Sequence, residues 1–296
     1  MDILRFLRKG RVHLTQLDPE KEEKNTPQLL EMISNSGTDG IIIAGSTNVN
    51  SENLLKLLYD CKRIDLPKIV APSSPEMVPP EVCKKILPCY TSEPLADYML
   101  VYDVINAEDP AFITGKHKEW YKMFYNAGIE PPSRSCCEEM AYIPCSHSGT
   151  VIKVVPIDPD FRTDNIVGLM MVGARRHPIV YLETTGLDVK LTGIKVSEYV
   201  REGRKFTSLS GFKDLIIISG GGIRSEEEAR ERLEAGANAI NVGDPLYFDD
   251  QPYGHAIYLS TIRGAKPEIR KEYHEKLYEE IYHMKLPSNL VSFKIE

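Results

Sequence analysis

Short apolar runs alternate with longer charged and amphipathic segments along most of the chain. Most of the runs are continuously apolar rather than alternating, as expected for parallel strands that are buried on both faces. The fifth run is the least regular, because Pro144 interrupts it. The pattern predicts eight strands: Val12–Leu17, Gly40–Gly45, Lys68–Pro72, Tyr98–Ile105, Ala141–Cys145, Ile179–Glu183, Leu215–Gly220 and Ala239–Gly243.

Helical patterns lie between several of these runs. Asn25–Ser36 and Ser51–Arg63 each gather leucine, isoleucine or methionine on one side. A third helix is expected at Glu226–Ala235, where Ser225 and Glu228 have the spacing of a capping box. Eight strands with intervening helices predict an α/β fold, a (β/α)8 TIM barrel, and a doubly wound open sheet is the alternative.

We expect one domain over residues 1–296, with a barrel core at about 11–250 and a C-terminal helical tail at 251–296. The proline-rich segment Ser73–Leu95 is predicted to be an insertion after the third strand, a long loop with a short helix. Lys266–Met284 is charged and rich in tyrosine, which favours a terminal helix that lies over the barrel or forms a subunit contact.

Composition narrows the classes of protein that need to be considered. The chain is 42% hydrophobic, enough for a sizeable core, and its net charge of -7 argues against nucleic acid as a partner. The chain begins with an acidic residue, Asp2, and lacks the long apolar core of a signal peptide, and Ile166–Ala174 is far shorter than the ~20 residues of a membrane span. We therefore expect a soluble, cytoplasmic protein.

Cysteine usage fits the same compartment. Free thiols are expected in a cytosolic chain of this size. The alternative is a metal site built from several of the cysteines with His147, although none of the spacings is a standard C-x2-C pair. The six cysteines are Cys61, Cys83, Cys89, Cys136, Cys137 and Cys145.

Two glycine loops carry the clearest functional signal. Ser219–Ser225 and Asn241–Pro245 each follow an apolar strand, and a helix separates them. Glycines let the backbone approach an anion, and the N–H groups of the loop and of the helix start face it. Parallel barrels hold phosphate groups with loops at their last two strands, so we expect a phosphorylated ligand at Gly220, Gly221, Gly222, Gly243 and Asp244.

Oxygen-bearing side chains end the first two strands. Asp18 follows the first strand at the catalytic face of a barrel, where a carboxylate can hold Mg²⁺. Ser46 follows the second strand and could offer an oxygen to the same metal or to its phosphate ligand. An Asp-Pro turn and a helix N-cap are the structural alternatives for these two residues.

The sixth strand ends in an acid. Glu183 comes after an apolar run, so it is expected to point into the barrel mouth and to accept a proton from a substrate hydroxyl. A purely structural pairing with an arginine is the alternative. Thr184, Thr185 and Gly186 could donate hydrogen bonds to a phosphate.

Several motifs together resemble those of a known family. The segments HLTQLDPEK, GTDGIIIAGST, YLETTG, SGGGIRSEEEARERLEAGANAI and VGDPLY, in this order, are similar to geranylgeranylglyceryl phosphate synthases and the related PcrB-type prenyltransferases. The resemblance implies a TIM barrel that joins a polyprenyl diphosphate, geranylgeranyl above all, to the sn-3 hydroxyl of sn-glycerol 1-phosphate. An ether lipid precursor forms and diphosphate leaves.

The resemblance also assigns roles to individual residues. Asp18 and Ser46 would bind Mg²⁺, and Glu183, the expected general base, would act with Asp18 in catalysis. An apolar product implies transient contact with a membrane surface, and we expect a homo-oligomer. The residues that would hold glycerol phosphate are Tyr181, Leu182, Glu183, Thr184, Thr185, Gly186, Gly220, Gly221, Gly222, Gly243 and Asp244.

Two other functions remain compatible with these residues. The same barrel could act on another phosphorylated acceptor, by prenyl transfer or by sugar-phosphate isomerisation with Asp18 and Glu183 as the acid/base pair. The chain could also be a non-catalytic paralogue that binds a phosphorylated ligand. A prenyl transfer assay with Mg²⁺, labelled glycerol 1-phosphate and prenyl diphosphates of several lengths tests the first function, and phosphate binding without turnover would support the non-catalytic one.

Overall fold

Eight parallel strands form a closed barrel in the computed structural model, which describes residues 2–45, 49–107, 109, 115–145, 162–185 and 194–287. Each strand pairs with the next along the chain, and the first pairs with the last. The strands are β1 (Val12–Leu17), β2 (Gly40–Ile43), β3 (Lys68–Val70), β4 (Tyr98–Val104), β5 (Cys137–Pro144), β6 (Ile179–Glu183), β7 (Ile216–Gly220) and β8 (Ala239–Val242).

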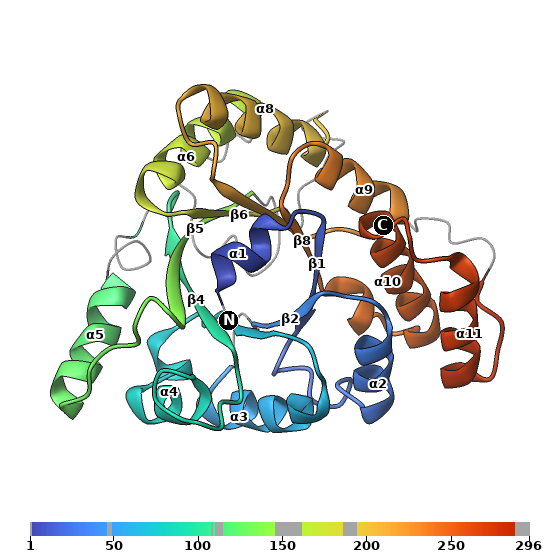
Figure 1. Cartoon of the computed structure of the whole chain (residues 1–296), viewed down its shortest axis with the longest axis horizontal. Helices are drawn as coiled ribbons and strands as arrows, with labels where there is room; N and C mark the ends of the chain where they lie inside the picture. The colour runs from blue at the N-terminus through green and yellow to red at the C-terminus, as the bar shows by residue number, and fades with distance from the viewer. Residues whose placement is uncertain are drawn as a thin grey trace.

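Helices surround this ring on all sides (Figure 1). The α-helices are α1 (Ile3–Arg8), α2 (Pro27–Asn35), α3 (Ser51–Asp60), α4 (Pro80–Ile86), α5 (Gly115–Ala127), α6 (Thr163–Arg176), α8 (Val196–Leu209), α9 (Glu226–Glu234), α10 (Gln251–Ala265) and α11 (Lys271–Tyr282). Short 3-10 helices are η1 (Cys61–Arg63), η2 (Pro75–Met77) and η5 (Asp244–Tyr247). The architecture is the predicted (β/α)8 barrel.

The sequence pattern located all eight strands to within a few residues. The largest difference is in β5, which begins at Cys137 rather than at Ala141. Pro144 is its last residue, where a missing N–H costs little, so the proline ends the strand instead of breaking it. The segment after β3 holds a short helix as expected, with α4 starting at two prolines whose fixed φ suits a first helical turn.

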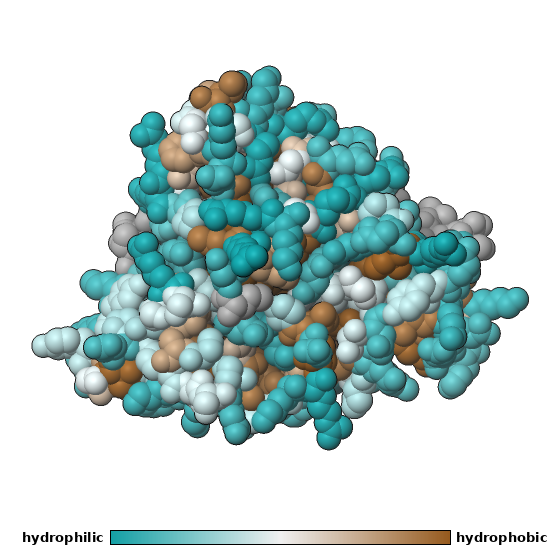
Figure 2. Space-filling view, in the orientation of Figure 1, coloured by the Kyte–Doolittle hydropathy of each residue, from teal (hydrophilic) through white to brown (hydrophobic). Residues whose placement is uncertain are grey.

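Helix α1 closes one end of the barrel. Ile3, Phe6 and Leu7 pack in one buried cluster with inward side chains of the strands, among them Leu14 and Ile42. In Figure 1 this helix lies across the centre of the ring. The surface on this side is mainly hydrophilic (Figure 2). Among the described residues, no helix combines the length and the apolarity that a membrane crossing requires.

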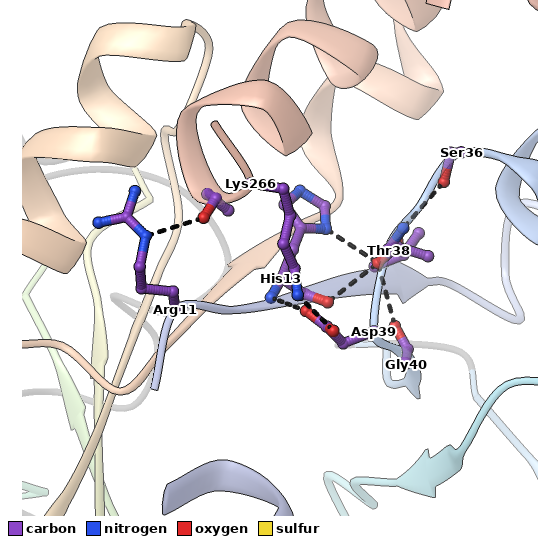
Figure 3. Close-up of polar contacts among 9 residues, drawn as sticks. Arg11, His13, Ser36, Thr38, Asp39, Gly40 and Lys266 are labelled. Atoms are coloured by element: carbon purple, nitrogen blue, oxygen red, sulfur yellow. Dashed lines mark hydrogen bonds and ion pairs between the residues drawn. The ribbon is translucent and has the colours of Figure 1, made fainter. Parts of the chain in front are cut away.

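The polar contacts that fasten the last barrel helix to the first strand are shown in Figure 3. Arg11 donates through Nε and Nη2 to the carbonyl oxygens of Ala265 and Gly264 at the end of α10, each at 3.0 Å. Asp39 accepts from the backbone N–H of His13 at 2.8 Å and from Lys266 Nζ at 2.6 Å. Helix α10 is buried along most of its length, although it lies beyond residue 250, in the segment that the sequence pattern assigned to a tail.

His13 is the centre of a buried hydrogen-bond network beside these contacts. Its Nδ1 lies 2.9 Å from Thr38 Oγ1, and its Nε2 lies 3.1 Å from Thr261 Oγ1. Thr15 extends the network to the Tyr258 hydroxyl at 2.7 Å. Burial, with smaller contributions from nearby Lys266 and His274, lowers the pKa of His13 to about 3, so the imidazole is neutral in the folded protein.

Two cysteines form a disulfide, which corrects the prediction that all six are free thiols. Cys89 follows α4 and Cys136 directly precedes β5, and their Cα atoms are 6.3 Å apart. The two segments meet because β4 and β5 are neighbours in the barrel, a proximity that composition cannot reveal. The other four cysteines are buried and free. No metal-binding group of three or more His, Cys, Asp or Glu occurs in the described part of the chain, and His147 lies outside it.

The buried histidine gives a testable pH dependence of stability. In the unfolded chain His13 has an ordinary pKa near 6.5, whereas in the folded protein it is about 3. Between these values the unfolded state binds a proton that the folded state does not, so the free energy of unfolding decreases as the pH falls from 6.5 toward 3, by up to about 1.4 kcal/mol per pH unit. Urea unfolding of the wild type and of His13→Gln at pH 7.5, 6 and 5 measures this. The stability difference between the two should shrink with falling pH, and parallel curves would contradict the assignment.

Candidate functional site

The carboxyl ends of the strands form the open mouth of the barrel, opposite α1. Two cavities open there, with volumes of about 360 and 380 Å³. Five residues line both: Gln16, Asp18, Glu183, Thr185 and Asp244. They come from the ends of β1, β6 and β8, so the closed ring brings together side chains more than 200 positions apart in the sequence.

The two cavities differ in chemical character. The first extends toward β3, β4 and α5 and is lined largely by apolar side chains, including Pro72, Val78, Val101 and Trp120. The second lies over the two glycine loops and is lined by Gly221, Gly222 and Gly243 with the cations Lys21 and Arg224. One compartment therefore suits an apolar chain and the other suits an anion.

Glycine is required at the first loop for two reasons. Gly221 and Gly222 have φ angles of +79° and +65°, a region that other residues rarely adopt. A Cβ at Gly221 would also overlap Glu183 Oε1 and the backbone N of Thr185. A Cβ at Gly220 would overlap the hydroxyl of Tyr181. The loop thus holds its backbone directly against the buried side chains of β6.

Glu183 is buried at the meeting point of the two cavities. Its Oε1 accepts hydrogen bonds from Thr185, at 2.8 Å from the backbone N–H and 2.5 Å from the hydroxyl. Its Oε2 accepts from the Tyr181 hydroxyl at 3.3 Å. Burial raises the pKa of this carboxyl above its ordinary value, and the bonds from Thr185 oppose the rise. A carboxylate with a raised pKa beside an open cavity can take a proton from a ligand hydroxyl.

Alternation along β6 decides which of the predicted residues reach the mouth. Tyr181 and Glu183 point into the barrel, whereas Leu182 points outward and packs in the cluster between strands and helices. Thr184 is also turned away from the cavities, and its hydroxyl donates to the carbonyl oxygens of Gly220 and Gly221 at 2.8 and 3.0 Å. It braces the glycine loop, while Leu182 belongs to the core. Gly186 lies outside the described residues.

Arg232 of α9 stands behind the glycine loop and was not singled out from the sequence. Its Nη1 donates to Thr184 Oγ1 and Ser219 Oγ at 3.2 Å and to the Gly220 carbonyl at 3.3 Å. Burial lowers the pKa of this guanidinium to about 10, so it keeps its charge at neutral pH. One feature of the sequence could have revealed Arg232: it lies between apolar residues on the buried face of the helix.

Asp18 projects into both cavities from the end of β1. Its Oδ1 accepts from the backbone N–H of Glu20 at 2.9 Å, and its own N–H donates to the Tyr247 hydroxyl at 2.7 Å. Its Oδ2 accepts no hydrogen bond from the described residues. Partial burial raises the pKa of Asp18 above its ordinary value. Ser46, the other predicted metal ligand, lies outside the described residues.

The donor set at Asp18 suits Mg²⁺ in a particular way. Mg²⁺ commonly keeps several waters and takes one or two carboxylates together with the phosphates of a substrate. A single carboxylate whose Oδ2 accepts no hydrogen bond from the described residues, in an open cavity, meets that requirement without a preformed cluster of acids. Asp18 can therefore hold a metal that arrives with a phosphorylated ligand.

The sequence profile of the PcrB family matches residues 2–259. The chain belongs to the PcrB family. The geranylgeranylglyceryl phosphate synthase of Methanoculleus marisnigri is 30% identical over 256 residues, which are 86% of this chain and 96% of the relative. The heptaprenylglyceryl phosphate synthase of Bacillus cereus is 27% identical over 263 residues, 88% of this chain and 98% of the relative.

Solved structures of related proteins agree with this PcrB-family barrel. One is the (S)-3-O-geranylgeranylglyceryl phosphate synthase of Thermoplasma acidophilum in complex with its substrate sn-glycerol-1-phosphate. It has a TM-score of 0.63 at 23% identity, over 90% of this chain and 98% of that one. The synthase of Thermoplasma volcanium has a TM-score of 0.65 at 22% identity, over 91% and 99% of the two chains. These likenesses show that the fold is shared.

The glycine loop yields a matched pair of variants. Gly221→Ala forces a methyl group against Glu183 and Thr185, whereas at Gly222 the nearest atom to a new Cβ, the Thr184 carbonyl oxygen, is 3.8 Å away. Both substitutions strain a positive φ, at a cost of about 1–2 kcal/mol. We expect only Gly221→Ala to displace Glu183 and to lower the affinity for inorganic phosphate by a further tenfold or so. Calorimetric titration with denaturant unfolding of both variants measures this, and equal losses of affinity would refute it.

Proposed function

We propose that this protein is a prenyltransferase that joins a polyprenyl diphosphate, geranylgeranyl diphosphate first among them, to the sn-3 hydroxyl of sn-glycerol 1-phosphate. The observation that carries the proposal is the meeting of an apolar cavity and an anion-binding cavity at Glu183 and Asp18. Family membership and the names of the relatives that the chain resembles over most of its length support the same reaction.

The phosphate of the acceptor would lie over the glycine loops. Gly221, Gly222 and Gly243 line that compartment together with Lys21 and Arg224, and the backbone N–H groups of the glycines would bind the phosphate. The loops leave room for a small headgroup, and Glu183 closes its inner end. A glycerol phosphate held by its phosphate would therefore present a hydroxyl to the carboxylate.

The prenyl diphosphate would occupy the other compartment. Its chain would lie among the apolar side chains near Val78, Val101 and Trp120, while its diphosphate would lie near Asp18 and Lys116. Asp18 would hold Mg²⁺ together with this diphosphate. When bound, Mg²⁺ would supply a Lewis acid for the negative charge that builds on the leaving group.

The reaction then follows from the placement of the two substrates. The acceptor oxygen forms a bond to the first carbon of the prenyl chain. The bond from that carbon to the diphosphate oxygen breaks, and its electron pair leaves with diphosphate. Glu183 takes the proton of the acceptor hydroxyl. Holding both substrates at one junction supplies much of the rate acceleration, because a bimolecular encounter is replaced by an oriented contact.

The complete assay uses purified protein, Mg²⁺, labelled sn-glycerol 1-phosphate and prenyl diphosphates of several lengths from geranylgeranyl to heptaprenyl. We expect an ether-linked product and release of diphosphate. Binding of glycerol phosphate without product at any length would refute the proposed reaction and would leave a phosphate-binding protein.

Replacing Glu183 by Gln should separate binding from chemistry. A glutamine oxygen can still accept from Thr185 but takes up no proton. We expect kcat to fall by about 10²–10⁴-fold while the affinity for glycerol 1-phosphate changes little. Glu231→Gln, which changes a half-buried acid paired with Lys195 outside the two cavities, is the matched control and should keep full activity. A rise in KM with kcat unchanged would show that Glu183 binds substrate without acting as the base.

Replacing Asp18 by Asn should remove metal-dependent activity. The substitution keeps the volume of the side chain but not its charge. We expect kcat/KM to fall at least about 100-fold, without recovery at high Mg²⁺ concentration. Asp249→Asn, which removes an exposed acid near Lys24, serves as the control. If the Asp18 variant regained full activity when more Mg²⁺ was added, or if the wild type were indifferent to chelation, the metal role of Asp18 would be wrong.

A further inference from the structure

Four polar side chains form a chain of hydrogen bonds across the floor of the mouth. Asn241 Nδ2 donates to Gln16 Oε1 at 2.6 Å and to the Tyr181 hydroxyl oxygen at 2.7 Å. The Tyr181 hydroxyl donates in turn to Glu183 Oε2 at 3.3 Å. The four residues come from β1, β8 and β6, and all of them occupy inward positions of their strands.

Burial makes this arrangement specific. Asn241 is 3% exposed and Tyr181 is 2% exposed. Water therefore cannot replace a lost partner at either group without a rearrangement of the floor. The close approach of Gly220 seals the Tyr181 hydroxyl from above, because any Cβ there would overlap it. The hydroxyl is left with the carboxylate of Glu183 as its acceptor.

Both amide hydrogens of Asn241 are used, one for each partner. Gln16 accepts one of them and so fixes the plane of the amide, while the other is directed at the Tyr181 oxygen. The side-chain amide oxygen of Asn241, Oδ1, is buried and has no partner among the described residues. A buried polar atom left unpaired costs free energy. The amide keeps this orientation because its NH2 group donates both of its hydrogen bonds in it.

We propose that Asn241, oriented by Gln16, is a positioning residue that directs the Tyr181 hydroxyl onto the carboxylate of Glu183. The inference rests on the proposed function, in which Glu183 is the general base. A donor to the phenol oxygen strengthens the phenol O–H as a donor, because successive hydrogen bonds polarise one another. Asn241 thereby stabilises the ionised form of a carboxyl that it does not touch.

Other groups also face Glu183, and they set the background against which the effect is measured. Like charge on Asp244 opposes its ionisation, and Thr185 favours it. Substitution at Asn241 leaves these groups unchanged. The hydrogen bond from the Tyr181 hydroxyl is therefore the interaction of Glu183 that the substitution alters. In the described part of the chain, the other groups that interact electrostatically with Glu183 are Tyr102, Tyr142, Cys145 and Arg232.

The test is a double-mutant cycle read by pH. Asn241→Leu keeps the number and branching of the side-chain heavy atoms and removes the donor, and Tyr181→Phe removes the hydroxyl. In each variant we expect the acid limb of the kcat/KM profile to move to higher pH, with activity on that limb reduced about tenfold. In the Tyr181→Phe background, Asn241→Leu should cause no further shift. An equal shift in both backgrounds would show that Asn241 acts independently of Tyr181 and would overturn the proposal.

A second readout does not depend on turnover. The titration of Glu183 can be followed by NMR in protein with ¹³C-labelled glutamate, with Glu183→Gln to assign the resonance. The titration midpoint of Glu183 should lie at higher pH in Asn241→Leu than in the wild type. In the double variant it should lie at the same pH as in Tyr181→Phe alone. An unchanged titration in Asn241→Leu would refute the positioning role. Absence of wild-type turnover alongside a shifted titration would refute the reaction but not the hydrogen-bond chain.

Two further variants guard against loss of folding as the explanation. Gln16→Met lies at the edge of the cavities, leaves Asn241 in place and removes only its anchor. We expect it to shift both readouts in the same direction by a smaller amount. Ile240 precedes Asn241 on β8 and packs outside the barrel, in the cluster between strands and helices. Ile240→Val should lower stability without shifting the pH profile or the titration of Glu183. A shift in Ile240→Val as large as that in Asn241→Leu would count against the proposal.

Discussion

Pairing between the first and last strands is the constraint on which the rest of the molecule depends. β1 bonds to both β2 and β8, and only this closure places Gln16 within 2.6 Å of Asn241, 225 residues further along the chain. The floor of the mouth is thus a consequence of a closed ring. At the other end of β1, Arg11 and His13 connect the strand to α10 and to the start of β2. The first strand is therefore held from both sides before any ligand is present.

The two ends of the barrel have separate tasks. One is filled by α1 and by the apolar side chains that it buries, which stabilises the ring. The other keeps a carboxylate, a tyrosine and an asparagine inside a low-dielectric floor, where each must be hydrogen-bonded to be tolerated. Enzymes with this barrel fold have their active sites at the carboxyl ends of the strands, because the loops there can vary without loss of the core.

Close backbone packing connects the first glycine loop, the proposed phosphate site, to Glu183, the proposed general base. Gly220 and Gly221 press against Tyr181 and Glu183, and Arg232 braces the same loop from behind. A ligand that orders the glycine loop would therefore also fix the carboxylate that faces it. The coupling is steric, because the loop backbone and the Glu183 carboxylate are in direct contact and a Cβ at Gly221 would not fit between them. It is the physical link between the proposed phosphate site and the proposed proton acceptor.

The sequence by itself determined the ring of eight strands, the two glycine loops and the acids at the ends of β1 and β6. Apolar runs, capping residues and glycines are local signals, and a parallel barrel repeats them in a fixed order. The sequence did not reveal the Cys89–Cys136 disulfide, the outward place of Leu182, or the contributions of Arg232, Gln16 and Asn241. Each of these depends on which side of a strand or helix faces which neighbour. Barrel closure and strand stagger set that relation. They bring together residues that are far apart in the chain, and nothing in the local sequence indicates the contact.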